Sequence, residues 1–182
     1  EVNFTDVNQI ARGIVANSYN SFFAGNADLI NASFHNLTLR YSSFNLFNAS
    51  NVFARINYRK TADQVNRNTI FAPGSVVSSS TSINSPLDNE SLTAFFGLGK
   101  TIKKIRMRLG GNFSYNKSYQ FINSRENTNE NISKGLNASI GTNFTKAPNV
   151  TFRYRVNFAD QSNSARSSDV KSITHVPSID FD

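Results

Sequence analysis

The sequence contains no cysteine and only two histidines. Without cysteine the fold has no disulfide bond and no thiolate ligand for a metal ion. The two histidines, His35 and His175, lie too far apart in the chain to form a zinc-binding motif. We therefore expect neither a metal site nor any other cofactor, and the sequence excludes a disulfide-stabilised scaffold.

Long apolar runs are also missing. No stretch approaches the roughly 18 apolar residues that a membrane-spanning helix needs. The mean hydropathy is −0.38, which is compatible with strands that cross a membrane, because such strands are half polar. Any membrane-spanning part of this sequence must therefore consist of strands.

Catalytic motifs and runs of like charge are missing as well. No serine lies in a Gly-x-Ser-x-Gly motif, and neither histidine has an acidic neighbour in the sequence. The net charge is +7, but the basic residues are spread singly along the chain. We therefore expect that the protein is not an enzyme and that it binds no nucleic acid.

Two segments, residues 105–115 and 150–158, alternate between apolar and polar side chains almost without exception. This period of two is typical of β-strands with one apolar and one polar face. Each polar face carries two arginines. An unpaired charge in a packed core costs several kcal/mol, so we expect these polar faces to meet water or fixed counter-charges.

Similar alternation predicts most of the remaining strands. Residues 1–31 have no sustained period, and we interpret them as mainly loop with a short strand near 10–16. Residues 32–182 should form about six to seven strands. Within them, Gly97, Gly99, Gly110 and Gly111 lie in or beside strands, where no helix follows to bind a phosphate. We interpret these glycines as small residues at bends or beneath a bulky neighbour.

The connections between the predicted strands differ in length in a regular way. Tight turns near residues 48, 102 and 147 alternate with long polar connections near 75, 124 and 165. In an up-and-down antiparallel sheet, this order places every short turn at one end and every long loop at the other. Residues 76–83 either extend the flanking strands or form an excursion, that is, a paired segment outside the main run of strands. Strands of roughly 9 to 13 residues are about twice the soluble mean and match the length that crosses a bilayer.

The alternation assigns each strand residue to one of two faces. If the strands cross a membrane, the apolar face meets lipid and the arginines face the lumen. The residues predicted to face lipid are Leu37, Leu39, Tyr41, Ile56, Met107, Leu109, Phe152, Tyr154 and Val156. The lumen-facing candidates are Arg40, Arg55, Arg59, Arg106, Arg108, Arg153 and Arg155.

Aromatic residues lie where the apolar stripes end. Tyr58, Tyr115 and Phe158 lie toward the long loops, and Phe47 and Phe144 toward the short turns. These are the positions of the two interfacial girdles of a membrane barrel. In the alternative fold, a soluble sandwich, the same aromatics would form the core, but a sandwich does not require all long loops at one end.

One short motif supports the membrane interpretation. The segment Gly25-Asn26-Ala27-Asp28-Leu29, followed by residues 35–41 and 54–58, resembles the barrel of TonB-dependent outer-membrane receptors. It is most similar to the branch in which a Gly-Asn-Pro-x-Leu loop leads into a down-going strand, with Ala27 here in place of the proline. The resemblance extends from about residue 8 to the end of the sequence.

The resemblance implies an all-β fold in which residues 1–182 form part of a large transmembrane β-barrel. Barrels of this family have about 22 antiparallel up-and-down strands around an N-terminal plug. This sequence would supply roughly seven of those strands. The plug, the TonB box and the closing strand are not in this sequence.

The resemblance also implies a function, namely active uptake of a scarce solute across the outer membrane of a Gram-negative bacterium. The solute would be an iron chelate, a glycan or a peptide, bound by residues 61–91 and 117–131 with a contribution from residues before 32. Implied partners are outer-membrane lipid, the protein's own plug and remaining strands, and a TonB-type energiser; a surface lipoprotein is a further candidate. The arginines would meet plug carboxylates, water or an anionic solute.

A second function class remains open. In it the chain belongs to a non-transporting β-protein, either a surface adhesin or a soluble β-sandwich that binds ligands on its loops. The solubility of the full-length protein to which this chain would belong, here called the parent, distinguishes the two hypotheses: a membrane barrel needs detergent, and a soluble sandwich does not.

Overall fold

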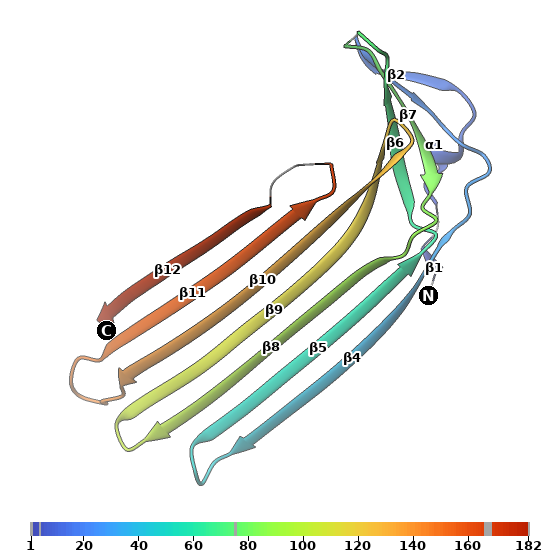
Figure 1. Ribbon diagram of the computed structural model, residues 1–182. Coiled ribbons are helices and arrows are strands. Elements are labelled where there is room, and N and C mark those ends of the chain that lie inside the picture. Colours follow the sequence, from blue (N-terminus) through green and yellow to red (C-terminus); the bar gives the residue numbers. More distant parts are fainter. Residues whose placement is uncertain (1, 4, 75, 166–168, 182) are drawn as a thin grey trace.

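The computed structural model describes residues 2–3, 5–74, 76–165 and 169–181. It is an all-β structure in which the described strands join one 12-stranded sheet, with a single short helix, α1 (Val7–Ile10). The long strands lie side by side (Figure 1), and there are seven of them among the described residues. They are β4 (Ala32–Asn45), β5 (Ser50–Ala62), β8 (Asn89–Ile102), β9 (Ile105–Ile122), β10 (Arg125–Thr142), β11 (Val150–Asn163) and β12 (Val170–Phe181). The short strands are β1 (Val2–Asn3), β2 (Ile14–Ser18), β3 (Ser21–Ala24), β6 (Val65–Phe71) and β7 (Ser78–Asn84).

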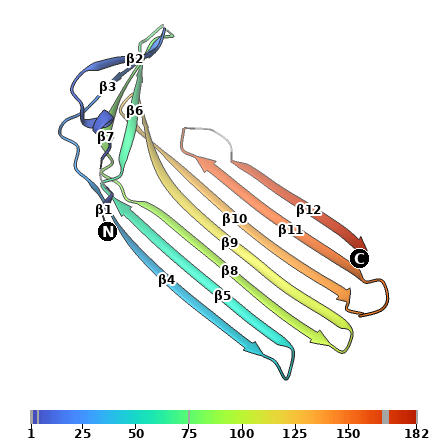
Figure 2. The ribbon, with the colours of Figure 1, turned by 180° about the vertical axis from the view of Figure 1, so that it is seen from behind.

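The seven long strands are antiparallel to their neighbours in the order β4, β5, β8, β9, β10, β11, β12. Figure 2 shows the same order from behind. The sheet is open. Among the described residues, the outer edge of β4 pairs only with the two residues of β1, and β12 pairs with β11 alone.

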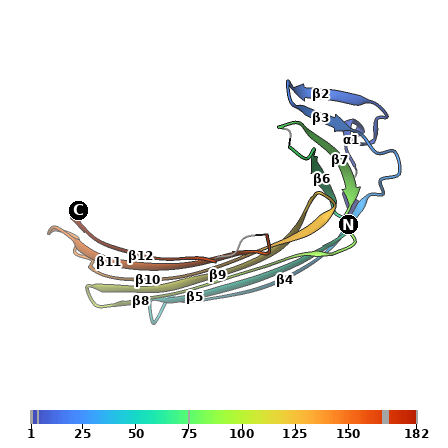
Figure 3. The ribbon, with the colours of Figure 1, turned by 45° about the horizontal axis from the view of Figure 1, so that its top comes forward.

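Apart from β1, which pairs with β4, the short elements lie together at one end of the long strands. We call this group, which consists of α1, β2, β3, β6 and β7, the upper unit. Figure 3 shows that the long strands form a shallow curved sheet and that the upper unit rises from its end. Here β6 runs parallel to β9, and β3 runs parallel to β7. The sheet is therefore mixed, and the prediction of a purely antiparallel arrangement is wrong in the upper unit.

The predicted distribution of turns is confirmed at one end of the sheet. The connections 46–49, 103–104 and 143–149 all lie at the end opposite the upper unit (Figure 1). Ala49 and Lys103 have positive φ angles of 44° and 53°, as tight turns often require. At the other end, β6 and β7 pair with each other. Of the two alternatives for residues 76–83, the excursion is therefore correct.

The predicted long loop at residues 117–131 is wrong. β9 and β10 continue as a paired ladder to Ile122 and Arg125, and only Asn123 and Ser124 form the turn. Their φ angles of 51° and 58° are those of a type I′ hairpin turn. Polar side chains do not prevent strand formation, because the ladder is made by backbone hydrogen bonds. The long polar connection predicted near residue 165 is also shorter than expected, because β11 continues to Asn163 and β12 begins at Val170.

Residues 1–31 contain more regular structure than the single short strand predicted near 10–16, because they include α1, β2 and β3, of which β2 overlaps that prediction. Asp6 caps α1 by accepting a hydrogen bond of 2.9 Å from the Asn8 N–H. A hairpin of β2 and β3 follows, and β3 pairs with β7, more than fifty residues further along the chain. A partner so distant in sequence leaves no local periodicity by which the strand could be recognised.

The open sheet has almost no core of its own. Among the described residues, the buried apolar side chains are Ala32 and Phe121. Most of the other buried residues are polar and lie where the upper unit meets the long strands, such as Asn68, Ser82 and Ser85. Burial of apolar surface is normally the main favourable term in folding. The large apolar side chains of the long strands must therefore be covered by something other than this sheet.

Candidate functional site

The cross-strand register puts the nine residues predicted to face lipid on one face of the sheet. Residues directly opposite each other in adjacent strands share a face. Leu39 is opposite Ile56, and Met107 is opposite Ile140, which is in turn opposite Phe152. Leu37 is 70% exposed and Leu109 is 45% exposed. We call this surface the apolar face; within the described residues no other element covers it.

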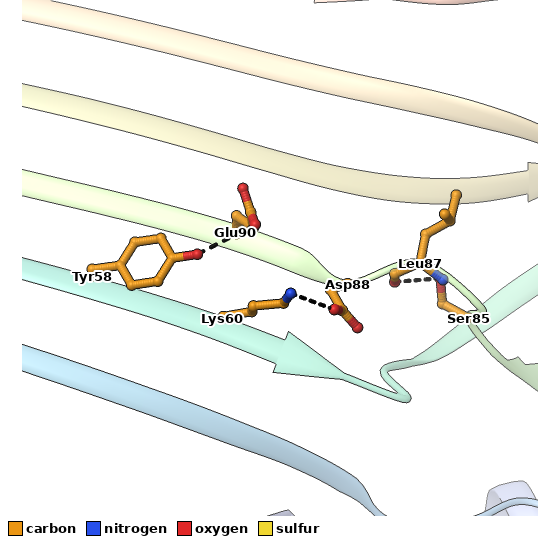
Figure 4. A network of polar contacts seen from close by, with 6 residues as sticks. All are labelled: Tyr58, Lys60, Ser85, Leu87, Asp88 and Glu90. Carbon is orange, nitrogen blue, oxygen red and sulfur yellow. Dashed lines mark hydrogen bonds and ion pairs between the residues drawn. The ribbon is translucent and has the colours of Figure 1, made fainter.

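A row of alternating charges borders the apolar face toward the upper unit. Lys60, Glu90, Lys117 and Glu130 lie opposite one another on β5, β8, β9 and β10. Lys117 Nζ lies 3.1 Å from Glu130 Oε1, and Lys60 Nζ lies 2.8 Å from Asp88 Oδ2 (Figure 4). These contacts raise the pKa of both lysines, chiefly through the hydrogen bonds to Asp88 and Glu130. Both lysines of the border therefore stay protonated at neutral pH.

The apolar face has a defined height. On β8 the side chains between Glu90 and Lys100 that lie on this face are Leu92, Ala94, Phe96 and Leu98. At about 3.3 Å per residue, the two charged positions are about 33 Å apart along the strand. Strands of outer-membrane barrels are tilted by about 40° from the membrane normal. With that tilt, a strand length of about 33 Å would span about 25 Å along the normal, which is the height of the apolar band on such barrels.

The predicted girdle residues lie near the two ends of this band. Tyr58 and Tyr115 are both opposite Leu92, in the row next to the charged border. The Tyr58 hydroxyl donates a hydrogen bond of 3.3 Å to Glu90 (Figure 4). Phe158 lies on the next row down, while Phe47 and Phe144 lie in the turns at the far end. Their positions thus match those expected of girdles.

Two polar side chains on the apolar face contact each other. The hydroxyl of Tyr154 lies 2.6 Å from Nδ1 of His175 on the neighbouring strand, and their rings are 6.0 Å apart. A polar group without a hydrogen-bond partner is costly in an apolar environment. This pairing allows both side chains to lie within the apolar band.

The seven arginines lie on the opposite face, which we call the polar face. Arg40 is opposite Arg55, and Ser139 lies between Arg108 and Arg153. The full set on this face is Arg40, Arg55, Arg59, Arg106, Arg108, Arg153 and Arg155. The register thus brings together the residues predicted to face the lumen.

Three of these arginines have partners within the sheet or its turns, of which one is a carboxylate. Arg153 forms an ion pair of 2.7 Å with Asp180 of β12. Arg106 donates a hydrogen bond of 2.9 Å to the side chain of Asn143, and the Arg59 guanidinium lies 3.9 Å from the centre of the Phe34 ring. By contrast, Nε of Arg55 is buried without a hydrogen-bond partner among the described residues.

Small residues form the floor of the polar face between the arginines. An open hollow of about 480 Å³ lies over Gly97, Gly99 and Gly110. A Cβ atom at Gly97 would lie 2.2 Å from the ring of Phe53, so the ring lies across the glycine. This confirms that the glycine lies beneath a bulky neighbour. A second hollow of about 420 Å³ lies among Arg108, Arg153 and Arg155.

A third hollow, the upper hollow, lies where the upper unit meets β9 and has a volume of about 550 Å³. The three segments predicted to recognise a solute come together here, because α1 and β3, then β6 and β7, then β9 each contribute to it. The guanidinium of Arg67 lies 5.4 Å from the centre of the Phe23 ring. The lining comprises Gln9, Phe23, Val65, Asn66, Arg67, Thr69, Phe71, Ser82, Tyr119, Gln120, Phe121 and Ile122. Six of these residues are polar and six are apolar or aromatic, so the hollow offers both hydrogen-bonding groups and stacking surfaces.

The glycine-asparagine motif attaches the first segment of the chain to this hollow. The Asn26 N–H donates a hydrogen bond of 2.8 Å to the Gln9 carbonyl, and its side-chain amide donates one of 3.1 Å to the Ser82 carbonyl. At Gly25, a Cβ atom would lie 2.0 Å from the carbonyl oxygen of Ala11. Only glycine permits this approach, which holds Gln9 in the lining.

Comparison of the sequence with protein-family models, with curated proteins and with solved structures found no match. The resemblance to TonB-dependent receptors therefore remains a prediction from the sequence pattern. In the part of the chain that the structure describes, no helix is long and apolar enough to span a membrane. The same residues contain no group of three or more His, Cys, Asp or Glu side chains placed to hold a metal ion.

Sequence reasoning missed two features of the site. The first is the charged border, although each of its residues continues the alternation of its strand by one more step. The second is Asp180, which falls on the polar face of β12 and pairs with Arg153. Continuing the period of two through the polar ends of the strands would have assigned the border residues and Asp180 to their faces, but it would not have shown that Asp180 pairs with Arg153.

We expect Gly25→Ala to loosen the first segment from the upper hollow. The added methyl group overlaps the Ala11 carbonyl, and overpacking of this kind costs about 1–3 kcal/mol. Hydrogen exchange at the Asn26 amide, which donates to Gln9, should accelerate. Ala27→Ser at the exposed neighbouring position is the control and should leave exchange unchanged. Equal protection of Asn26 in both variants would contradict this account of the motif.

Proposed function

We propose that this chain forms part of the wall of a transmembrane β-barrel in a bacterial outer membrane, and that the barrel is a TonB-dependent receptor that imports a scarce solute. The observation that carries the proposal is the apolar face. It is continuous over seven strands, about 25 Å tall, and bordered by ion pairs just beyond an aromatic row.

A soluble β-sandwich explains this face less well. Its core would need a second sheet packed about 10 Å above the first. Within the described residues the sheet has no such layer, and large side chains such as Phe152 and Ile179 remain 45% and 59% exposed. A sandwich also gives no reason for a sharp charged border or for all short turns at one end. The surface adhesin remains the second candidate, since an adhesin also presents loops outside a membrane.

The open edges favour additional strands as partners. In hydrocarbon each unpaired backbone N–H or C=O costs several kcal/mol, which is why only closed barrels and helices span membranes. The outer edges of β4 and β12 carry such groups along most of their length. Pairing with the remaining strands of a barrel would satisfy both edges.

The polar face would line the lumen. Exposed arginines around a floor of glycine, serine and asparagine form a positive surface on which Asp180 is the single carboxylate that pairs with an arginine among the described residues. Guanidinium groups bind carboxylates in a two-pronged geometry. Carboxylates of a plug are the counter-charges that we propose; the TonB-type energiser and the surface lipoprotein rest on the resemblance alone.

Solute binding would take place at the upper hollow. It is concave and has the size of a small-molecule site. The nature of the solute, whether iron chelate, glycan or peptide, is left open by this lining.

Arginine substitutions test the orientation of the sheet. An arginine at the bilayer midplane on the lipid side costs about 2–4 kcal/mol. Leu109→Arg and Phe152→Arg should therefore prevent stable insertion of the parent barrel. Asn112→Arg, on the polar face of β9, is the matched control and should be tolerated.

A soluble core would also be damaged by Leu109→Arg, so a second measurement separates the two folds. A spin label at position 109 should be reached by a lipid-soluble quencher, and a label at position 112 should not. Equal tolerance of all three arginine variants, or equal quenching at both positions, would overturn the assignment of the faces.

Shortening the β9–β10 hairpin tests the role of the upper hollow. Residues 119–128 can be replaced by Asn-Gly, because Ser118 and Asn129 are directly opposite each other and a two-residue loop joins such a pair. The parent barrel should still assemble but should no longer bind its solute, since the wall from Tyr119 to Ile122 is removed. Ser124→Gly is the control, because it changes the turn and keeps that wall. Unchanged solute uptake by the shortened protein would move the binding site elsewhere.

Charge reversal tests the partner of the arginines. Arg106→Glu with Arg108→Glu should leave the barrel inserted but make it leak small solutes, because repelled carboxylates loosen the plug. Lys103→Glu with Lys104→Glu makes the same change of charge in the nearby turn and should not leak. A sealed barrel that loses only the uptake of an anionic solute would instead assign the arginines to the substrate path. If neither leakage nor uptake changes, these arginines contact only water in the lumen.

A further inference from the structure

One residue does not fit the apolar face. Lys134 of β10 is opposite Phe113 on one side and Phe158 on the other, so it lies on the apolar face. In the described long strands, Asp160 and Lys171 lie on this face one row inside the charged border, Lys134 lies one row further in, and no other formally charged side chain lies between the border and Lys100. An ionisable residue at such a position requires a partner.

The protein itself does not supply that partner. Lys134 forms no ion pair or hydrogen bond among the described residues. The nearest carboxylate across the strands is that of Asp160, one row closer to the border and about 7 Å further along the strand. Asp160 already pairs with Lys171 of β12 at 3.6 Å. Asp160 thus pairs with Lys171 alone, and Lys134 leaves the cluster of three with a net formal charge of +1.

The surroundings of the cluster are apolar. A shallow hollow of about 260 Å³ lies between the two lysines, and its lining includes Ile132, Phe158 and Ile173. The flexible stem of lysine can lie along such side chains while its ammonium group reaches toward the charged border. The hollow thus combines an unbalanced positive charge at its rim with apolar side chains below it.

We propose that this hollow binds the head group of an anionic membrane lipid, with a phosphate between Lys134 and Lys171 and the acyl chain on Phe158 and Ile173. The inference rests on the proposed function, because it requires the apolar face to meet lipid. A lipid supplies both missing components, since its phosphate balances the charge and its chain covers the apolar side chains. A soluble anion would balance the charge but leave these side chains exposed.

The experiment uses the full-length parent protein and two lipids, phosphatidylglycerol and phosphatidylcholine. After extraction from mixed vesicles, native mass spectrometry measures how many molecules of each lipid remain bound. The wild-type protein should retain phosphatidylglycerol in preference to phosphatidylcholine. Lys134→Gln should lower this preference by about fivefold, the factor expected for one cation near an anionic membrane surface.

Two further variants separate a specific site from general attraction. Lys134→Arg keeps the charge and should retain the preference. Lys146→Gln removes a lysine from the turn at the opposite end of the sheet and should have no effect. Equal losses in Lys134→Gln and Lys146→Gln, or no preference in the wild-type protein, would overturn the lipid site.

A flotation assay distinguishes failure of this inference from failure of the proposed function. If the parent floats with vesicles of both lipids but shows no preference, the lipid site is wrong and the membrane barrel stands. If the parent floats with neither, both proposals are wrong. Flotation together with a preference that depends on Lys134 supports both.

Discussion

The cross-strand register is the constraint on which the rest of the structure depends. Side chains on a strand alternate with a period of two, so a slip of one residue would exchange the two faces of that strand. From β4 to β12 the pairing keeps parity through seven strands. Apolar residues from distant parts of the chain therefore gather on one face, and the arginines gather on the other.

The same register produces the charged border. Lys60, Glu90, Lys117 and Glu130 come from four different strands, yet they meet in one row because the pairing register places them opposite one another. Exposed ion pairs contribute little to stability, typically below about 1 kcal/mol each. Their significance here is positional, since they end the apolar face at the same row on β5, β8, β9 and β10.

Beyond the charged border, the strands lose their apolar face and the sheet is no longer purely antiparallel. The strands continue as polar ladders, and parallel pairing of β6 with β9 and of β3 with β7 joins segments that the long strands separate in sequence. Side chains of the upper unit rather than of the curved sheet supply most of the walls of the upper hollow. The regular sheet thus positions the irregular elements at its end, and these elements form most of the hollow that we propose as the binding site.

The sequence by itself determined the seven long strands, their two faces and the positions of the short turns, because a period of two is a local property that each segment carries alone. It also placed all seven arginines on one side. Only the tertiary structure decided that residues 117–131 form a hairpin, that β3 pairs with β7, and that Asp180 meets Arg153. These features depend on backbone ladders and on partners distant in sequence. Polar strands carry no apolar stripe, so the local pattern could not distinguish them from loops.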